Sequence, residues 1–240
     1  MTERPKTHLS VSEREAMTEK FSGYIFDLDG TLLDSMQLWL DIDRAFLREL
    51  GFEADDDYSQ AVKSMGYEAA AQYTVDRYLL DLSAEEVMRR WQEMSFIAYD
   101  RHVDLKPGAL DYLHTLKTQG KRLGIATALN QTHIEAALNR HAIKHLFDTI
   151  TMLSEVHRGK GHPDIYLLAA QRLGIHPSHC IVFEDILSGI KGAKKGGFTV
   201  CGVFDASSEK DWTEIGAYAD LTIRHWDELR TIRSDEADAR

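Results

Sequence analysis

Over most of the chain, short apolar runs alternate with longer segments in which apolar residues recur every three or four positions. Runs of the first kind are typical of buried strands, and segments of the second kind are typical of amphipathic helices. The pattern predicts strands at 24–27, 122–129, 149–154, 179–185, 199–204 and 219–223. Because strands that alternate with helices form parallel sheets covered on both faces, we expect an α/β fold with a doubly wound, Rossmann-like sheet.

The stretch 36–105 breaks this alternation, because it shows helical periods and no strand pattern. Ser83 followed by Glu86 predicts a capping box, in which each side chain hydrogen-bonds the backbone of the other residue at a helix start. We therefore predict a helical cap subdomain inserted after the first strand. The predicted division is a polar N-terminal extension at 1–20, a core at 21–35 and 106–230, the cap at 36–105 and a polar tail at 231–240.

The composition is that of an ordinary soluble globular protein, with 43% hydrophobic and 28% charged residues. A formal net charge of −11 argues against nonspecific binding to nucleic acid or anionic membranes, so we expect neither partner. No apolar stretch reaches the length of a membrane span and the N-terminus lacks an apolar signal region, so we expect a cytoplasmic protein. Cys180 and Cys201 lie in apolar, strand-like stretches, which indicates buried free thiols.

The segment GYIFDLDGTLLDSM, at 23–36, delivers two carboxylates to the tip of the first predicted strand. Ligands of parallel α/β sheets bind outside the carboxyl ends of the strands, so Asp27 should point into that crevice with Asp29 close by. Two neighbouring carboxylates repel one another and raise one pKa unless a cation lies between them. A hard divalent metal, most simply Mg²⁺, suits such oxygen ligands.

Polar side chains follow other predicted strands at the same edge of the sheet. Thr127 lies at the end of the second strand, Lys160 follows the third, and Glu184 and Asp185 close the fourth. A metal and a lysine can neutralise the charge of a phosphoryl group while hydroxyl and backbone donors position its oxygens. This combination is typical of phosphoryl transfer.

With these motifs in this order, the sequence resembles the haloacid dehalogenase (HAD) superfamily of phosphatases over about residues 22–225. Within it, the chain is similar to the subgroup with an inserted helical cap that includes β-phosphoglucomutase. The DLDGTLLD motif at 27–34 is the specific one, and the other three gain weight from their order and their places at strand ends. One departure lies after the lysine, where Gly161 stands in place of the commoner proline of the family.

The resemblance implies a role for each of these residues. Asp27 would be the nucleophile that forms an aspartyl-phosphate, and Asp29 would be the acid for the leaving alcohol and then the base for water. Thr127 would bind a phosphoryl oxygen, and Lys160 would bridge Asp27 and the phosphate. The Mg²⁺ ligands would be Asp27, Asp29 through its carbonyl, Glu184 and Asp185.

Single motifs also have simpler explanations. A D-x-D-G run can begin a calcium loop, but the terminal glutamate of such a loop would fall at Leu38. Asp34 suits a helix N-cap or a hydrogen bond within the loop better than a metal ligand. His141 and His145 have the spacing of a helical metal pair, yet no acidic motif accompanies them, so we expect only a surface helix end.

The cap should decide between hydrolysis and transfer of the phosphoryl group within one sugar. In the mutase, a histidine, a cap arginine and polar residues after the second motif hold a distal phosphate, and the matching positions here are Trp39, Tyr67 and Leu129. Because loss of the arginine and the polar donors removes the groups that would hold a distal phosphate dianion, these departures favour hydrolysis. Trp39 and Lys63 are the cap residues that we expect to bind the substrate.

Our first hypothesis is therefore a Mg²⁺-dependent phosphatase that hydrolyses a small phosphorylated metabolite such as a sugar phosphate, with the cap excluding bulk water. The alternative is a sugar-phosphate mutase similar to β-phosphoglucomutase. A third hypothesis, a phosphoester-binding protein without turnover, is opposed by the complete set of catalytic positions. Because the chemistry needs only one chain, we expect a monomer.

Overall fold

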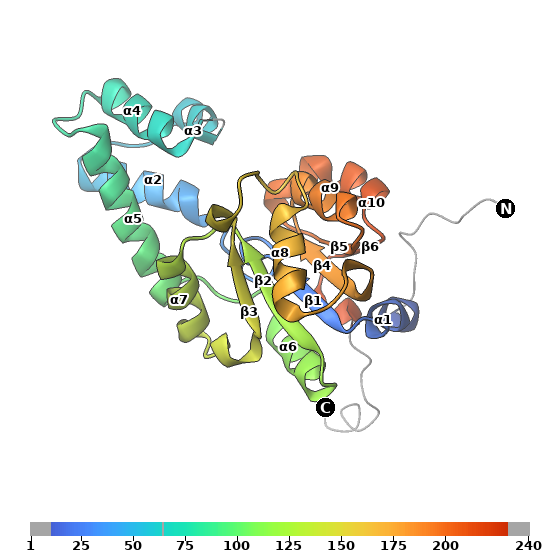
Figure 1. The fold of residues 1–240 in the computed structure, drawn as a ribbon. Coiled ribbons are helices and arrows are strands. Elements are labelled where there is room, and N and C mark those ends of the chain that lie inside the picture. The colour runs from blue at the N-terminus through green and yellow to red at the C-terminus, as the bar shows by residue number, and fades with distance from the viewer. Residues whose placement is uncertain (1–10, 64, 230–240) are drawn as a thin grey trace, which may run out of the picture.

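The computed structural model describes residues 11–63 and 65–229, with a parallel sheet at its centre (Figure 1). The strand order is β3-β2-β1-β4-β5-β6, and every neighbouring pair is parallel. The strands are β1 (Gly23–Phe26), β2 (Arg122–Thr127), β3 (Thr149–Met152), β4 (Cys180–Glu184), β5 (Thr199–Val203) and β6 (Leu221–Ile223). Each predicted strand is confirmed to within two residues at its ends.

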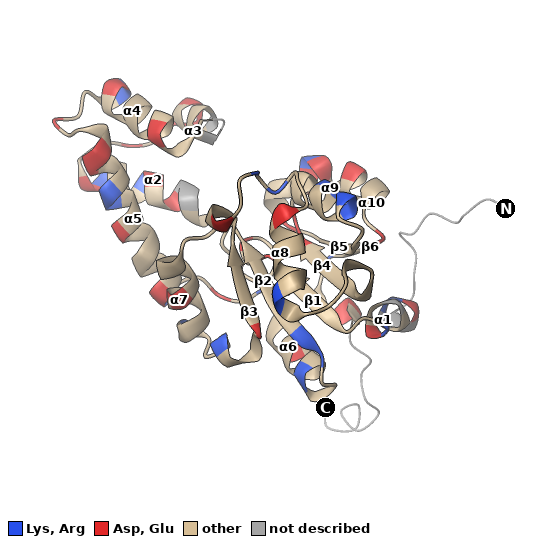
Figure 2. Cartoon of the chain, viewed as in Figure 1, with Lys and Arg blue, Asp and Glu red and all other residues tan. Residues whose placement is uncertain are grey.

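The strands supply two apolar layers, one on each face of the sheet. Successive residues of a strand point to opposite faces, so Tyr24 and Phe26 join one core cluster and Ile25 joins the other. The helices over the first face are α6 (Ala109–Thr118) and α7 (Gln131–Arg140); those over the second are α8 (Asp164–Leu173), α9 (Leu187–Lys195) and α10 (Trp212–Tyr218). The predicted doubly wound α/β class is therefore confirmed, and the strands carry almost no charged residues (Figure 2).

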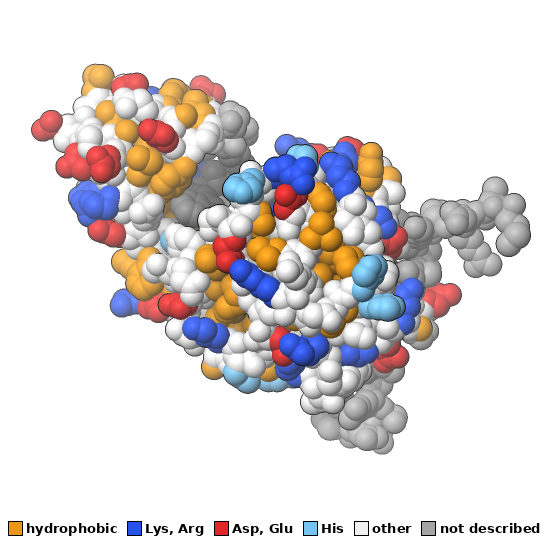
Figure 3. Space-filling model, in the orientation of Figure 1, with side chains coloured by type: hydrophobic (Ala, Val, Ile, Leu, Met, Phe, Trp, Pro, Cys, Tyr) orange, Lys and Arg blue, Asp and Glu red, His pale blue; other side chains and the backbone are white. Residues whose placement is uncertain are grey.

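Helices between β1 and β2 form a cap that projects from the core as a separate lobe (Figures 1 and 3). Their own apolar cluster includes Phe46 and Trp91, which are in edge-to-face contact. The predicted capping box of Ser83 and Glu86 starts the last of these helices. The predicted helical cap is thus confirmed, and its helices are α2 (Leu38–Glu49), α3 (Asp56–Lys63), α4 (Tyr67–Tyr78) and α5 (Ala84–Arg101).

The two chain crossings between cap and core run side by side. Leu33, before the cap, forms an antiparallel bridge with Leu105, after it. A second contact joins α5 to α7, where the Ser95 Oγ and His133 Nε2 atoms are 2.7 Å apart. The cap is therefore tied to the core by its own chain ends and by one helix pair, while the exact limits 36–105 stay a prediction.

Asp34 does not cap a helix, contrary to one of the two roles expected for it. Helix α2 begins only at Leu38, after Gln37. The Asp34 N–H instead donates to the Asp104 carbonyl at 2.9 Å, within the paired crossings. Because this pairing holds Asp34 outside the helix, the N-cap falls three residues later.

The histidine pair lies at a helix end, as expected, but does not share a helix face. Helix α7 ends at Arg140, so His141 is its C-cap and His145 falls in the following 3-10 turn, η2 (Lys144–Leu146). The His141 Nε2 atom lies 2.9 Å from the Val103 carbonyl oxygen. This contact gives His141 a structural role at the cap junction.

The N-terminal helix α1 (Val11–Glu19) packs on the core against η6 (Trp226–Leu229), and Arg14 forms an ion pair with Glu228. Residues 1–10 of the predicted N-terminal extension and the predicted polar tail fall outside the described residues. Among the described helices, none is both long and apolar enough to cross a bilayer.

Cys180 and Cys201 are buried in the sheet, on β4 and β5. Neither forms a disulfide, so the expectation of free thiols is confirmed. Burial raises the pKa of the Cys180 thiol to about 11, which keeps this side chain protonated and unreactive.

Candidate active site

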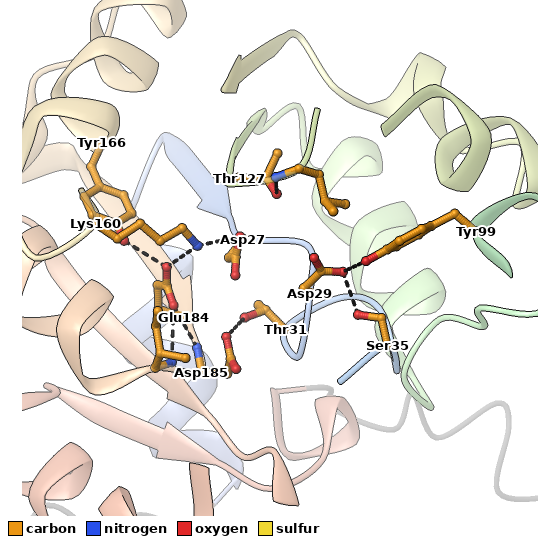
Figure 4. A network of polar contacts seen from close by, with 12 residues as sticks. Asp27, Asp29, Thr31, Ser35, Tyr99, Thr127, Lys160, Tyr166, Glu184 and Asp185 are labelled. Atoms are coloured by element: carbon orange, nitrogen blue, oxygen red, sulfur yellow. Dashed lines mark hydrogen bonds and ion pairs between the residues drawn. The ribbon is translucent and has the colours of Figure 1, made fainter. Parts of the chain in front are cut away.

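The candidate active site lies at the carboxyl ends of β1 and β4, the two central strands of the sheet (Figure 4). The strand order reverses its direction between them, which opens a crevice beyond the strand ends. Asp27 follows β1 directly, and its N–H donates to the Phe183 carbonyl of β4 at 3.0 Å. Glu184, the last residue of β4, is thereby fixed beside Asp27.

Lys160 lies between these two carboxylates. Its Nζ atom is 2.6 Å from the Asp27 Oδ1 atom and 2.6 Å from the Glu184 Oε1 atom. The lysine side chain is only 7% exposed, so both ion pairs are shielded from water. Buried ion pairs are stabilising only where the geometry satisfies both charges, and this lysine therefore has a fixed position over the proposed nucleophile.

Glu184 is held from several sides. Its Oε1 atom also accepts a hydrogen bond from the Tyr166 hydroxyl at 2.8 Å, and its Oε2 atom accepts from the N–H groups of Asp185 and Ile186 at 3.1 and 3.3 Å. Because both oxygens already have protein donors, Glu184 is well placed to orient Lys160. The same contacts make it a weaker metal ligand than its neighbour.

The site holds more negative charge than Lys160 can balance. Asp27, Glu184 and Asp185 are all buried. Burial raises the pKa of Asp27 to about 7, although the Lys160 charge opposes this shift. Burial, followed by the Glu184 and Asp27 charges, raises the pKa of Asp185 well above its ordinary value. A further cation would relieve this repulsion.

The acidic cluster fits a divalent metal. One oxygen from each of Asp27, Glu184 and Asp185 lies within 4.8 Å of the other two. The Asp185 Oδ1 atom accepts from the Thr31 hydroxyl at 3.2 Å, whereas its buried Oδ2 atom has no hydrogen-bond donor among the described residues. A buried carboxylate oxygen without a donor is costly, and an oxygen-seeking cation such as Mg²⁺ would satisfy it.

Asp29 is held apart from the lysine cluster by hydrogen bonds of its own (Figure 4). Its Oδ1 atom accepts from the Ser35 hydroxyl at 2.6 Å and from the Tyr99 hydroxyl, on cap helix α5, at 2.7 Å. Burial raises the pKa of Asp29, while the two hydrogen bonds lower it. A raised pKa favours the protonated form, which is the form that a general acid needs.

Thr127 closes β2, the strand beside β1, at the same edge of the sheet. Its side chain is 1% exposed, and its Oγ1 atom accepts a hydrogen bond from the Leu129 N–H at 3.2 Å. This contact fixes the oxygen and leaves the hydroxyl proton available. Thr127 can therefore donate to a ligand in the crevice.

Two glycines make room for the site. Gly30 has a φ of +72°, and a Cβ atom there would lie 2.3 Å from the Asp185 Oδ2 atom. In α9, a Cβ atom on Gly192 would lie 1.9 Å from the Lys160 carbonyl oxygen. A side chain at Gly30 would displace the Asp185 carboxylate, and one at Gly192 would displace the Lys160 backbone.

The network includes polar residues to which the sequence analysis gave no role: Thr31, Ser35, Tyr99 and Tyr166. Thr31 and Ser35 lie within or next to the DLDGTLLD motif, so proximity to the acidic residues could have pointed to them. Tyr99 and Tyr166 lie on distant helices, and their hydroxyls reach the site only through the fold.

The cap residues expected to bind substrate are outside the described side chains. Trp39 lies in α2 and Lys63 ends α3, but only their backbones are described. Of the other cap-dependent positions, Tyr67 donates to the Met88 carbonyl at 3.0 Å, and Leu129 is part of the buried core. Leu129 therefore offers no polar group to a second phosphate.

A cavity of about 990 Å³ lies between cap and core, and its walls are formed by residues other than the acidic residues of the site. Its walls include Asp43, Tyr67 and Trp91 from the cap and Phe204 and Arg224 from the core. Met36 also lines it, and both Met36 and Asp185 flank the space that a Cβ atom on Gly30 would fill. The cavity is large enough for a small metabolite, and Met36 links its wall to the Gly30 turn of the acidic site.

Comparison with known proteins agrees with this geometry. The model of the haloacid dehalogenase-like hydrolase family matches residues 24–203. A phosphorylated carbohydrates phosphatase of Thermotoga maritima is 27% identical over 81% of this chain and 91% of its own length. The fructose-1-phosphate phosphatase of Escherichia coli is 30% identical over 75% of this chain and 95% of its own length.

Solved structures show the same fold. A Thermotoga maritima protein assigned as a β-phosphoglucomutase superposes with a TM-score of 0.79 and 26% identity, covering 87% of this chain and 96% of that one. A β-phosphoglucomutase of Clostridium difficile gives a TM-score of 0.66 at 20% identity, covering 91% of this chain and 96% of that one. The family match spans the acidic loop, the lysine and the acidic pair. The chain therefore belongs to the haloacid dehalogenase-like hydrolase family, as a member with a helical cap inserted after its first strand.

Proposed function

We propose that this protein is a Mg²⁺-dependent phosphatase that hydrolyses a small phosphorylated metabolite through an aspartyl-phosphate intermediate on Asp27. As a member of a hydrolase family with relatives named as phosphatases, it is a phosphomonoester hydrolase. The observation that carries the finer proposal is the buried contact of Lys160 with Asp27 and Glu184, next to the unpaired Asp185 oxygen. A nucleophilic carboxylate, a fixed cation and a metal-binding acid thus share one crevice.

In this proposal Asp27 and Asp185 hold the metal, with the Asp29 carbonyl and Glu184 as further candidates. When bound, Mg²⁺ supplies positive charge that offsets the negative charge of the phosphate and of the acidic cluster. Lys160 supplies a second, permanent positive charge at the same place. A nucleophilic carboxylate can approach a phosphate dianion only where such cations screen the repulsion.

Asp27 and Asp29 carry out the two chemical steps. An Asp27 carboxylate oxygen attacks phosphorus, and the bond from phosphorus to the ester oxygen breaks as Asp29 donates its proton to the leaving alcohol. Asp29 then accepts a proton from the water that attacks the phosphorus of the aspartyl-phosphate, which releases phosphate and restores Asp27. Thr127 and Lys160 hold phosphoryl oxygens in both steps.

The support for a small substrate comes from the cavity and from the relatives. The cavity of about 990 Å³ has the size of a small-metabolite site. Relatives of this chain are named as phosphatases of phosphorylated carbohydrates, fructose 1-phosphate and validoxylamine A 7'-phosphate. We propose a sugar-like phosphomonoester, or a compound of similar size, as the substrate.

The mutase alternative has less support. A mutase must hold a second phosphate while the intermediate is present, and this requires cationic or polar donors in the distal pocket. Leu129 is apolar and buried, and the Tyr67 hydroxyl donates to a backbone carbonyl. These contacts favour water as the acceptor of the phosphoryl group.

The proposed function can be tested by phosphate release from p-nitrophenyl phosphate and a panel of phosphorylated metabolites. We expect turnover that depends on Mg²⁺ and is abolished in Asp27→Asn. Turnover of equal rate in that variant, or in the presence of a chelator, would refute the proposal. Conversion of β-glucose 1-phosphate without release of free phosphate would favour the mutase.

A further inference from the structure

The cap end of the cavity contains a carboxylate that the phosphatase chemistry does not use. Asp43, in α2, is half-buried and lines the cavity. Among the described residues, no hydrogen bond or ion pair reaches its carboxylate. Burial raises the pKa of Asp43 to about 7. A partly desolvated carboxylate without a partner is costly, and it indicates a place where a ligand supplies the missing charge or donor.

Two aromatic residues line the same cavity as this carboxylate. Tyr67 and Trp91 line the same wall, with their ring centroids 5.7 Å apart. Burial and then the Asp43 charge raise the pKa of the Tyr67 hydroxyl to about 12. Aromatic faces attract cations through their quadrupole. A cavity wall with a carboxylate and two rings therefore has the chemistry of an ammonium site.

The core wall of the cavity carries basic side chains. Its charged residues from the core include Lys210 and Arg224, and Lys106, which pairs with Asp205 at 2.8 Å. A substrate with its phosphate at the acidic site and its alcohol toward the cap would meet Asp43 with the alcohol portion. That end of the cavity disfavours anions, because a second carboxylate or phosphate there would repel Asp43.

We propose that Asp43, together with the rings of Tyr67 and Trp91, binds a positively charged amino group, so that the alcohol portion of the preferred substrate carries an amine. This inference rests on the proposed phosphatase function and assigns its substrate class. An aminoalkyl or aminosugar phosphate has the required arrangement, with a dianion at one end and an ammonium group at the other.

The test compares matched substrates that differ only in the amine. With Mg²⁺ present and at about pH 8, kcat/KM is measured for 4-aminobutyl phosphate against pentyl phosphate, and for glucosamine 6-phosphate against glucose 6-phosphate. A charge-assisted contact predicts a preference for the amine of about tenfold or more in both pairs. In Asp43→Asn, which keeps the shape and removes the charge, the ratio should fall to about one.

Asp41→Asn is the matched control, because Asp41 lies on the same helix and is exposed. This variant changes the net charge equally and should keep the wild-type ratio. The thermal midpoint of Asp43→Asn should equal or exceed that of the wild type, because no folded-state partner is lost. Calorimetric Kd values of the paired phosphates for Asp27→Asn give the same ratio without turnover.

A ratio near one in the wild type, an unchanged ratio in Asp43→Asn, or equal use of glucose and glucosamine phosphates would overturn the amine site. If p-nitrophenyl phosphate is hydrolysed in an Asp27-dependent way under those conditions, the phosphatase function stands and only this inference fails. If no phosphoester is hydrolysed, the proposed function fails, and the calorimetric ratio alone decides the amine site.

Discussion

The Tyr99 hydroxyl donates a hydrogen bond of 2.7 Å to the Asp29 carboxylate and so joins cap helix α5 to the proposed general acid. The Tyr99 ring is also in edge-to-face contact with His133, on core helix α7, with centroids 5.0 Å apart. The Tyr99 side chain thus contacts both core helix α7 and the loop that carries Asp29. The orientation of Asp29 therefore depends on the position of the cap.

Tyr99→Phe should shift the pH dependence of the first chemical step. The hydroxyl stabilises the ionised form of Asp29, so its loss should raise the Asp29 pKa further above its ordinary value. Because a general acid acts while protonated, the upper limb of the kcat/KM profile for an alkyl phosphate should move to higher pH. We also expect kcat to fall about tenfold as Asp29 loses its fixed orientation. An unchanged profile would contradict this role, and Tyr218→Phe, at an exposed site on α10, is the control.

Lys160→Met should destabilise the protein as well as inactivate it. The substitution leaves Asp27 and Glu184 buried without their shared cation, which should lower the free energy of unfolding by about 3–5 kcal/mol. Urea unfolding measures this change, and added Mg²⁺ should recover part of it. Lys191→Met removes an exposed ion pair with Glu214 of the same 2.6 Å length and should cost no more than about 1 kcal/mol. Equal losses in the two variants would be incompatible with a buried, charge-balanced site.

Mg²⁺ should change the pH dependence of stability. Burial raises the pKa of Asp27 to about 7 from an ordinary 3.8, so the folded state keeps a proton that the unfolded state releases between these values. Without metal, the free energy of unfolding should therefore decrease as the pH rises through this window. Mg²⁺ binds the ionised carboxylates and should restore stability most above about pH 7. A Mg²⁺ effect of equal size at about pH 5 and pH 8 would argue against these ligands; Asp185→Asn should reduce the effect.

Gly192→Ala should impair catalysis through the lysine loop. A Cβ atom at this position would lie 1.9 Å from the Lys160 carbonyl oxygen, so the loop must move. A displacement of this kind should reduce kcat by about 100-fold while the circular dichroism spectrum stays unchanged. Gly161→Ala is the matched control in the same loop, because no atom lies within 4 Å of its Cβ position. Equal activities of the two variants would show that the close contact is unimportant.

The predicted sheet is confirmed, and the acidic residues expected at its edge lie together in the structure, because both follow from local patterns. Strands appear as apolar runs, and their carboxyl ends meet at one edge in any parallel sheet. The prediction for Asp34 was wrong in part, because its backbone is paired with Asp104, a residue from the far end of the cap. Tyr99 and Tyr166 could not be predicted for the same reason. Their contacts depend on the packing angles of α5 and α8, which no local pattern encodes.

The sequence also could not show which cap residues face the substrate. Asp43 sits on an amphipathic helix like many acidic residues, and its unpaired state becomes visible only when the cavity wall is assembled. We expected from the sequence that the cap decides the substrate, but only the fold shows which cap residues line the cavity. The sequence analysis named Trp39 and Lys63, whose side chains are not described, whereas the cavity lining directs attention to Asp43.

The central claim is that Asp27 becomes phosphorylated, and trapping of this intermediate tests it most directly. Asp29→Ala, which lacks the base for the second step, is mixed with Mg²⁺ and acetyl phosphate carrying a radiolabelled phosphoryl group, and is then quenched in acid. Acetyl phosphate has a good leaving group, so the first step does not need the missing acid. We predict close to one acid-stable, hydroxylamine-sensitive label per chain, absent when Asp27→Asn is added. Label that persists in the double variant, or rapid turnover of unlabelled protein, would contradict the account.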